Sequence, residues 1–132
     1  MSHPSLRVAA LVPRGDDYLM LRTGTHWQLP AASVRIGETL AEAVVRALAD
    51  QVGLVDAICG PFIGWAEAVE AVAPDTHSVT MYFRAVTLES ETEPSSPSAE
   101  VRWIPSWDAA ELGLADGLAE FLSDHGYIET LV

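Results

Sequence analysis

The chain has no lysine, a single cysteine and no apolar run long enough to cross a membrane. Because Cys59 has no second cysteine to pair with, an internal disulfide is excluded and a cysteine-based zinc site is not expected. The apolar stretch 6–12 follows no basic run and is far shorter than the roughly 20 residues of a membrane helix. We therefore expect a cytoplasmic protein that does not enter a membrane.

Positive charge is also scarce, because 7 arginines face 19 acidic residues and give a formal net charge of −12. A surface of this charge repels a phosphate backbone, so we expect no binding to long nucleic acid. A small phosphorylated ligand is compatible with this charge, because a bound divalent cation reverses the sign of the local field. The alternative without a ligand is that the excess of acidic residues only keeps the protein soluble.

The length of 132 residues fits one domain, residues 1–132, and is too short for two. With 49% hydrophobic residues the chain can build a packed core. β-Branched and apolar segments bounded by turn residues predict strands at 6–13, 18–22, 27–30, 54–72, 78–88 and 101–105. The strand at 54–72 is interrupted by glycine and proline, and the acidic segment 89–100 is predicted to be an exposed loop.

A central helix is predicted from Leu40, with Thr39 as its N-cap, Glu42 completing a capping box and Gly53 as its stop. Its helical period places apolar residues on one face: Ala41, Val44, Val45, Leu48 and Val52. Two shorter helices are predicted at 106–112 and 116–126. Strands, one central helix, more strands and a terminal helix indicate a mixed α/β layered domain.

The stretch from Trp27 to Leu54 resembles the Nudix box, the signature of hydrolases that cleave nucleoside diphosphates linked to another moiety. Its matching positions are Glu38, then seven intervening residues, Arg46, Leu48, Gly53 and Leu54. The segments "LMLRTGTHWQLP", "HSVTMYFRA" and "AEVRWIPSWDAAEL" resemble the run-up and the later segments of the family in the same order. The resemblance implies the Nudix fold, a mixed β-sheet sandwiched between helices (α/β/α).

The chain departs from this family at the positions that carry the chemistry. Ala31 and Ala32 replace a glycine pair, while Ala47, Asp50 and Gln51 replace three glutamates. These three positions are related by i, i+3 and i+4 and share one helix face. In the family, acids there hold magnesium against a diphosphate, where the metal neutralises phosphate charge and activates a water. Only Asp50 keeps its charge.

The resemblance implies a Mg²⁺ (or Mn²⁺) site made by Asp50, the amide oxygen of Gln51, the backbone carbonyl of Ala32 and Glu100. Glu100 precedes the segment Val-Arg-Trp, where many Nudix enzymes place a distant ligand or base. The alternative for Glu100 is an exposed acid beside an acidic loop. Together with Glu100, the resemblance assigns Glu38 and Arg46 to the catalytic machinery, as an ion pair that ties the loop to the helix.

Four arginines are candidates for binding ligand phosphates, because guanidinium groups bind phosphate in bidentate fashion: Arg22, Arg35, Arg84 and Arg102. A surface ion pair is the alternative for any one of them. Trp27, Trp65, Tyr82 and Trp103 are able to stack on a base, although core packing is favoured for each, with Trp65 the most open.

Two functions follow from the resemblance. The first is a Nudix hydrolase that cleaves a pyrophosphate bond in a nucleoside diphosphate-linked substrate, weakened because the box lacks two of its glutamates. The second is a catalytically inactive Nudix-fold module that binds a nucleotide or a protein. The expected ligand is a small phosphorylated molecule such as a nucleotide, with a protein as the alternative for the inactive module, and the resemblance also implies a homodimer. A third reading is a pure dimerisation domain.

Overall fold

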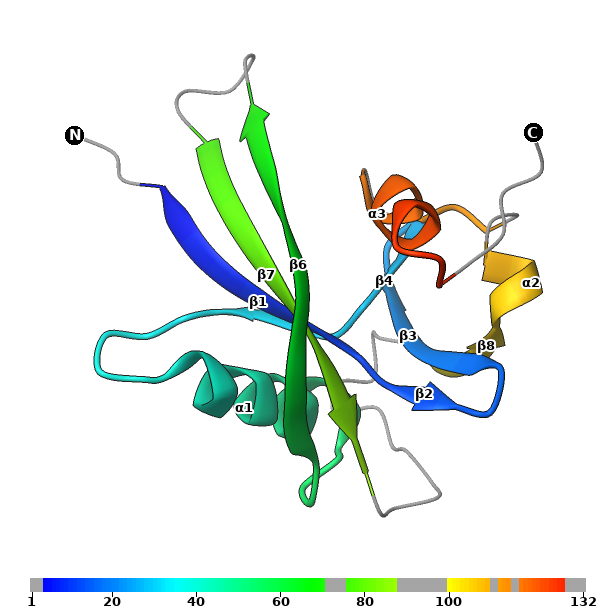
Figure 1. Ribbon diagram of the computed structural model, residues 1–132, viewed down its shortest axis with the longest axis horizontal. Coiled ribbons are helices and arrows are strands. Elements are labelled where there is room, and N and C mark those ends of the chain that lie inside the picture. The colour runs from blue at the N-terminus through cyan, green and yellow to red at the C-terminus, as the bar shows by residue number, and fades with distance from the viewer. Residues whose placement is uncertain (1–3, 71–75, 88–99, 110–111, 115–116, 128–132) are drawn as a thin grey trace.

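The computed structural model describes residues 4–70, 76–87, 100–109, 112–114 and 117–127 (Figure 1). Within these residues the chain forms two four-stranded sheets and three helices. No described helix combines the length and the apolar composition that crossing a membrane requires. The loop predicted at 89–100 lies outside the described residues except for Glu100.

The large sheet has the strand order β5-β1-β7-β6. Its members are β5 (Ala31–Ser33), β1 (Ser5–Leu11), β7 (Thr76–Val86) and β6 (Ile58–Glu70). β1 runs parallel to β7, whereas the β1–β5 and β6–β7 pairs are antiparallel. The sheet is therefore mixed, as predicted.

The second sheet is built around β3 (Asp17–Thr23). β8 (Glu100–Pro105), β4 (His26–Gln28) and the short β2 (Pro13–Arg14) all pair with β3 in antiparallel fashion. The sequence predicts one strand over 6–13, but the chain passes from the large sheet to the second sheet at Val12. Val12 O accepts a hydrogen bond from Leu19 N (3.0 Å), which anchors this crossing.

The central helix α1 (Leu40–Val52) begins and ends where the sequence predicts. Thr39 Oγ1 accepts from Glu42 N (3.1 Å) and Glu42 Oε1 accepts from Thr39 N (3.0 Å), which completes the capping box. Gly53 ends the helix with φ 74°, a left-handed conformation that glycine adopts without a steric penalty.

The buried face of α1 is turned slightly from the predicted one. Ala43 and Ala47 are buried, whereas Ala41 is exposed and Val45 is only half-buried, so the prediction was wrong for Ala41. The two C-terminal helices, α2 (Ser106–Ala109) and α3 (Leu118–Asp124), lie where helices are predicted but are shorter.

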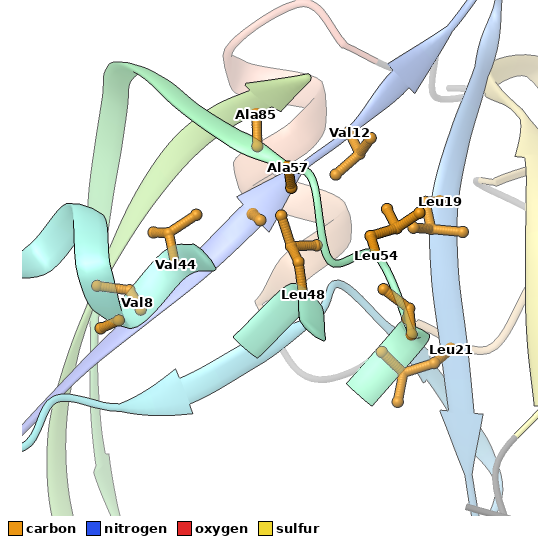
Figure 2. Close-up of a cluster of buried hydrophobic side chains, with 12 residues drawn as sticks. Val8, Val12, Leu19, Leu21, Val44, Leu48, Leu54, Ala57 and Ala85 are labelled. Carbon is orange, nitrogen blue, oxygen red and sulfur yellow. The ribbon is translucent and has the colours of Figure 1, made fainter. Parts of the chain in front are cut away.

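Alternating residues of β1 supply two hydrophobic clusters, one on each face of the large sheet. Val8, Ala10 and Val12 face α1 and pack with Val44 and Leu48 (Figure 2). On the opposite face, Ala9 and Leu11 belong to a cluster that includes Leu118 and Leu122 of α3. The sheet is therefore covered by helices on both faces, which is the α/β/α arrangement.

β6 is one strand of 13 residues, although glycine and proline interrupt its pattern. Its register with β7 shifts between Cys59 and Phe62 and again between Phe62 and Gly64. At Gly60 a Cβ atom would lie 2.8 Å from the carbonyl oxygen of Arg84, so only glycine fits this close approach. Beyond Gly64 the register is regular to the end of the strand.

Candidate functional site

A bidentate ion pair joins the loop before α1 to the helix. Arg46 Nε lies 2.8 Å from Glu38 Oε2, and Arg46 Nη2 lies 3.0 Å from Glu38 Oε1. Arg46 Nη2 also donates to Ser33 O on β5 (2.7 Å), and Glu38 Oε1 accepts from Arg35 N (3.1 Å). Donation from Arg46 is the main reason that the pKa of Glu38 falls to about 2. The ion pair expected between Glu38 and Arg46 is confirmed, and it leaves Glu38 ionised at neutral pH.

A second contact between α1 and β5 is made by Gln51. Its Oε1 atom accepts a hydrogen bond from Ala31 N at 2.9 Å. With the Arg46–Ser33 bond, this fastens the helix to the edge strand at two residues of β5. Asp50 lies next to Gln51 in sequence, and its carboxylate is 4.0 Å from Arg46 Nη1 with 62% of the side chain exposed. Asp50 is therefore an accessible acid beside these contacts.

The register of β5 decides which backbone groups face the helix. Ala10 N donates to Pro30 O (2.9 Å), and the paired residues Val8 and Ala32 follow two positions along the ladder. Because hydrogen-bonded pairs alternate in an antiparallel ladder, the Ala32 carbonyl points to β1. The neighbouring carbonyl of Ala31 points away from β1, on the side where Ala31 N meets Gln51.

Ala47, the first of the three box positions on α1, is part of the core. It is 1% exposed, while Asp50 three residues later is open to solvent. The helix face shared by positions 47, 50 and 51 thus runs from the core to the surface. In this chain Ala47 contributes packing and no metal ligand.

Glu100 is held between two arginines. Arg22 Nη2 lies 2.9 Å from Glu100 Oε1, and Arg102 Nη2 lies 2.9 Å from Glu100 Oε2. Both guanidinium groups lie over the ring of Trp27, at 5.4 and 5.8 Å from its centroid. Each carboxylate oxygen of Glu100 therefore forms an ion pair with an arginine, and Arg22 is one of the two.

The other two predicted phosphate ligands lie apart from this cluster. Arg35 is exposed in the loop between β5 and α1, and Arg84 is exposed on β7, paired in register with Leu11. The four predicted arginines therefore belong to three different parts of the fold: Arg22 and Arg102 to the second sheet, Arg35 to the loop and Arg84 to the large sheet.

A cavity of about 130 Å³ opens on the face of the large sheet that α3 covers, beside the end of β4. Arg7, Gln28, Thr80 and Tyr82 give it polar groups, and its apolar lining is Ala9, Leu29, Ala31 and Leu118. Arg7 Nη1 donates to Ser33 Oγ (3.3 Å), so the guanidinium lies beside β5. Because the Ala31 N–H also donates to Gln51 Oε1, the cavity and the helix share this residue.

Sequence reasoning missed Arg7, Gln28 and Thr80. The signal was available only in part: Arg7 alternates with the buried Val8, so it lies on the opposite face of β1. Which strands flank Arg7 on that face depends on the parallel β1–β7 pairing, which the sequence does not reveal. Tyr82 was considered as a core residue, and it is 9% exposed.

One wall of the cavity is supported by stacked rings. Tyr82 stacks on Phe121 with centroids 3.9 Å apart, and Phe121 stacks on His125 at 4.2 Å. Burial raises the pKa of the Tyr82 hydroxyl, so it remains a hydrogen-bond donor across the physiological pH range. The stack holds α3, and with it Leu118, against the large sheet.

The residues present fit a metal ion in one way only. Among the described residues, no three His, Cys, Asp or Glu side chains lie close enough together to hold a metal. Magnesium often uses only one or two carboxylates and completes its shell with phosphates and waters. Asp50 meets that need, because its carboxylate is exposed to solvent. Its ion pair with Arg46 is long, at 4.0 Å. The site therefore fits magnesium that binds together with ligand phosphates, and not a metal centre made by the protein alone.

Comparison with known proteins agrees with this architecture. The structure resembles the MutT protein from Methanosarcina mazei Go1 with a TM-score of 0.81, 18% identity and 96% of each chain covered. It resembles a NUDIX hydrolase from Nitrosomonas europaea with a TM-score of 0.77 and 18% identity, covering 98% of this chain and 94% of that one.

The NUDIX domain of Shewanella oneidensis NrtR, solved with ADP ribose, gives a TM-score of 0.72 and 21% identity, covering 94% of this chain and 89% of that one. No curated protein sequence matches the chain significantly. The sequence model for the NUDIX domain, however, matches residues 1–125. This match spans nearly the whole chain, and the protein therefore belongs to the NUDIX domain family.

Proposed function

We propose that the protein is a weakened Nudix hydrolase, which binds a small nucleoside diphosphate derivative in the cavity and cleaves its pyrophosphate bond slowly. The observation that carries this proposal is the position of Ala31. It lines the cavity and is held by Gln51, the direct neighbour of the exposed Asp50. A ligand seated in the cavity would therefore extend its phosphates along β5 towards Asp50.

Each residue has a distinct part in this proposal. Arg7 binds an anionic or carbonyl group of the ligand, and Tyr82 and Leu118 enclose its ring. Asp50 and the outward carbonyl of Ala31 are the groups that would hold magnesium. When bound with the phosphates, the metal would neutralise their charge and activate a water. The Glu38–Arg46 pair keeps β5 and α1 in position and does not touch the ligand.

Slow cleavage follows from what the site lacks. Gln51 supplies no charge, Ala47 is buried, and Glu100 is already paired with two arginines. A general base has to be free to accept a proton. Glu100 would have to leave both arginines to do so, and this is the main reason that we propose weak activity.

A second candidate, a binding module without turnover, is favoured by the same Glu100 contacts. The experiment that separates the two measures binding and product formation on one sample. ADP ribose is a suitable first probe, because the NUDIX domain of NrtR was solved with it. Calorimetry with millimolar Mg²⁺ or Mn²⁺ gives the affinity, and phosphate-containing products are followed by chromatography over hours.

The variants are Asp50→Ala and, as a matched control, Asp124→Ala at the exposed end of α3. The hydrolase proposal expects metal-dependent turnover that Asp50→Ala abolishes and Asp124→Ala preserves. Binding without products identifies the binding module instead. If nucleoside diphosphates, nucleoside triphosphates and ADP ribose all fail to bind with metal present, both candidates are refuted.

A further inference from the structure

A groove of about 630 Å³ lies between α1 and the start of β6 (Figure 1). Small-molecule sites usually have volumes of about 300–1,000 Å³ and a mostly apolar lining with a few charged or polar groups. The groove agrees with that class of site in volume and in lining. Its floor consists of apolar side chains from one side of the helix and from the facing strand: Ala41, Val45, Ala49, Ala57, Ile58 and Cys59.

The groove is separate from the cavity and from the box positions. At 3.6 residues per turn, Val45 and Ala49 each point roughly 160° away from Ala47 around the axis of α1. Within the described residues, the groove and the cavity share no lining residue. A molecule in the groove is therefore bound apart from the proposed substrate, and its binding does not depend on hydrolysis.

Three charged side chains line the groove, and two of them compensate each other. Glu38 and Arg46 form the bidentate ion pair, whereas Glu42 has no cationic partner among the described residues. Glu42 Oε1 accepts from Thr39 N at 3.0 Å. This hydrogen bond lowers the pKa of Glu42, so its carboxylate is ionised at neutral pH. The groove thus combines an apolar floor with one uncompensated negative charge.

This charge favours a small cation over the other candidates for the groove. The segments outside the described residues contain no arginine or lysine, so none of them offers Glu42 a permanently charged side chain. A second copy pairing groove to groove would add acid to acid, in molecules that each carry a formal net charge of −12. A stable protein interface usually takes about 20–30 residues from each partner, whereas nine residues line this groove.

The shape of the groove favours an elongated ligand. Ala41, Val45 and Ala49 recur every four residues, so they form one stripe along the helix, about 12 Å long at a rise of 1.5 Å per residue. Ile58, which is 58% exposed, lines the same groove from β6. Because Glu42 follows Ala41 in the first turn of α1, the charged end of a ligand belongs at that end of the stripe.

We propose that the groove between α1 and β6 binds a small amphiphilic cation, which has an elongated apolar chain and one terminal ammonium group. The chain covers Val45, Ala49 and Ile58, and the ammonium group lies beside Glu42. Burial of apolar surface supplies most of the affinity, and the charge selects against neutral and anionic analogues.

The test uses the full chain and octylammonium as the probe, below the concentration at which it self-associates. Octanol has the same chain without the charge, octanoate reverses the charge, and butylammonium shortens the chain. Calorimetry should show octylammonium binding at least tenfold tighter than butylammonium, because each buried CH₂ group adds affinity. It should bind about threefold tighter than octanol, as expected for an exposed ion pair, and octanoate should bind more weakly than octanol.

Cys59 shows where the ligand binds. It is the only cysteine of the chain and lines the groove, so its rate of labelling by a neutral maleimide reports on this groove alone. Saturating octylammonium should slow the labelling at least threefold, and the same concentration of butylammonium should not. Binding by calorimetry without any change in labelling would place the ligand elsewhere and overturn the proposal.

Glu42→Gln removes the charge and keeps the capping box, because glutamine also accepts the Thr39 N–H. It should weaken octylammonium binding about threefold and leave octanol binding unchanged. Glu120→Gln is the matched control, since Glu120 is likewise the third residue of its helix and is exposed, and it should change neither affinity. Equal octylammonium affinity in wild type and Glu42→Gln would refute the proposed contact.

Ile58→Ser tests the apolar floor, and Val69→Ser, at a 66% exposed position near the other end of β6, is its control. Ile58→Ser should weaken octylammonium and octanol binding by the same factor, about fivefold, whereas Val69→Ser should affect neither. A stable dimer in analytical ultracentrifugation that Ile58→Ser dissociates and Val69→Ser does not would assign the groove to a second copy instead.

Discussion

Gln51 and Ala31 are joined by a hydrogen bond from the Ala31 N–H to the side-chain oxygen of Gln51, 2.9 Å long. A glutamate at position 51 could accept the same bond, so the change from the family's acid to an amide preserves the attachment of α1 to β5. It removes only the charge. The fold therefore retains this contact although the chemistry is weakened.

Gln51→Glu should keep the hydrogen bond and add a second carboxylate next to Asp50. We expect Mg²⁺ affinity in the presence of ADP ribose to rise at least several-fold, because magnesium would gain a charged ligand. Gln51→Ala should instead destabilise the protein by about 1 kcal/mol, the usual net value of one hydrogen bond. Calorimetry and urea unfolding check the two effects. Equal metal affinity in wild type and Gln51→Glu would contradict the proposed site.

Ala47→Glu restores a family residue, yet we expect it to damage the protein. Ala47 is 1% exposed in the core, so a glutamate there must be buried or must displace its neighbours. The free energy of unfolding should fall by at least about 2 kcal/mol. Ala41→Glu, at an exposed position of the same helix, is the control and should change it by less than about 0.5 kcal/mol. Both values come from urea unfolding.

The ion pair of Glu38 predicts a loss of stability in acid. Hydrogen bonds from Arg46 hold the pKa of Glu38 at about 2 in the folded protein, below its ordinary value of 4.5. The stabilisation is therefore complete above pH 4.5 and is lost as the pH falls from there towards 2. Wild type should be more stable than Glu38→Gln at pH 7, and the difference should shrink below pH 4. A constant difference between pH 7 and pH 2 in thermal unfolding would contradict this role.

Gly64→Ala should loosen α3. A Cβ atom at Gly64 would lie 2.8 Å from His125 Nε2 and 2.9 Å from a ring carbon of Phe121, and its φ of 154° is one that other residues rarely adopt. We expect a destabilisation of about 1–3 kcal/mol. The cavity wall should move with the helix, so ligand affinity should fall as well.

Gly113→Ala is the matched control, because the nearest atom to its Cβ would be Thr25 O at 3.5 Å. It should change neither stability nor affinity measurably. Thermal unfolding and calorimetry on both variants test the ring stack as the support of the cavity.

Arg7→Ala should reduce ligand affinity about tenfold or more, because hydrogen bonds to a charged group contribute about 1.5–3 kcal/mol. Arg14→Ala, on β2 in the second sheet, changes the net charge equally and is the control. An equal loss in both variants would show that total charge, and not the cavity, determines binding.

The sequence predicts local structure well where the signals are local. The limits of α1 follow from Thr39, Glu42 and Gly53, whose contacts lie within a few residues along the chain. The family resemblance supplies the layered architecture. Strand order is a different matter: the position of Arg7 in the cavity depends on β1 pairing with β7, and no short-range signal indicates that pairing.

In the candidate site, too, some contacts are predictable from the sequence, whereas others depend on tertiary strand pairing. The Glu38–Arg46 ion pair is expected from the resemblance and is present. The engagement of Glu100 by Arg22 and Arg102 requires β3 and β8 to be neighbours, with Arg22 opposite Glu100 in the register. Ala32 was expected to offer its carbonyl, but the β1–β5 register directs the Ala31 carbonyl outward. These details depend on which strands pair and in which register, and neither composition nor hydrophobic periodicity indicates that.

The parallel pairing of β1 with β7 sets the order in which the protein can fold during synthesis. Ser5 and Leu6 pair with Ser78 and Val79. The first strand to leave the ribosome therefore cannot form this pairing until a segment more than 70 residues later has been synthesised. Until β7 emerges, Val8 and Ala10 have no central strand beside them, and α1 has only part of the surface that it covers. Contacts between such distant segments slow folding. The N-terminal half therefore cannot complete its core alone, and a nascent chain stalled before residue 76 should remain sensitive to protease.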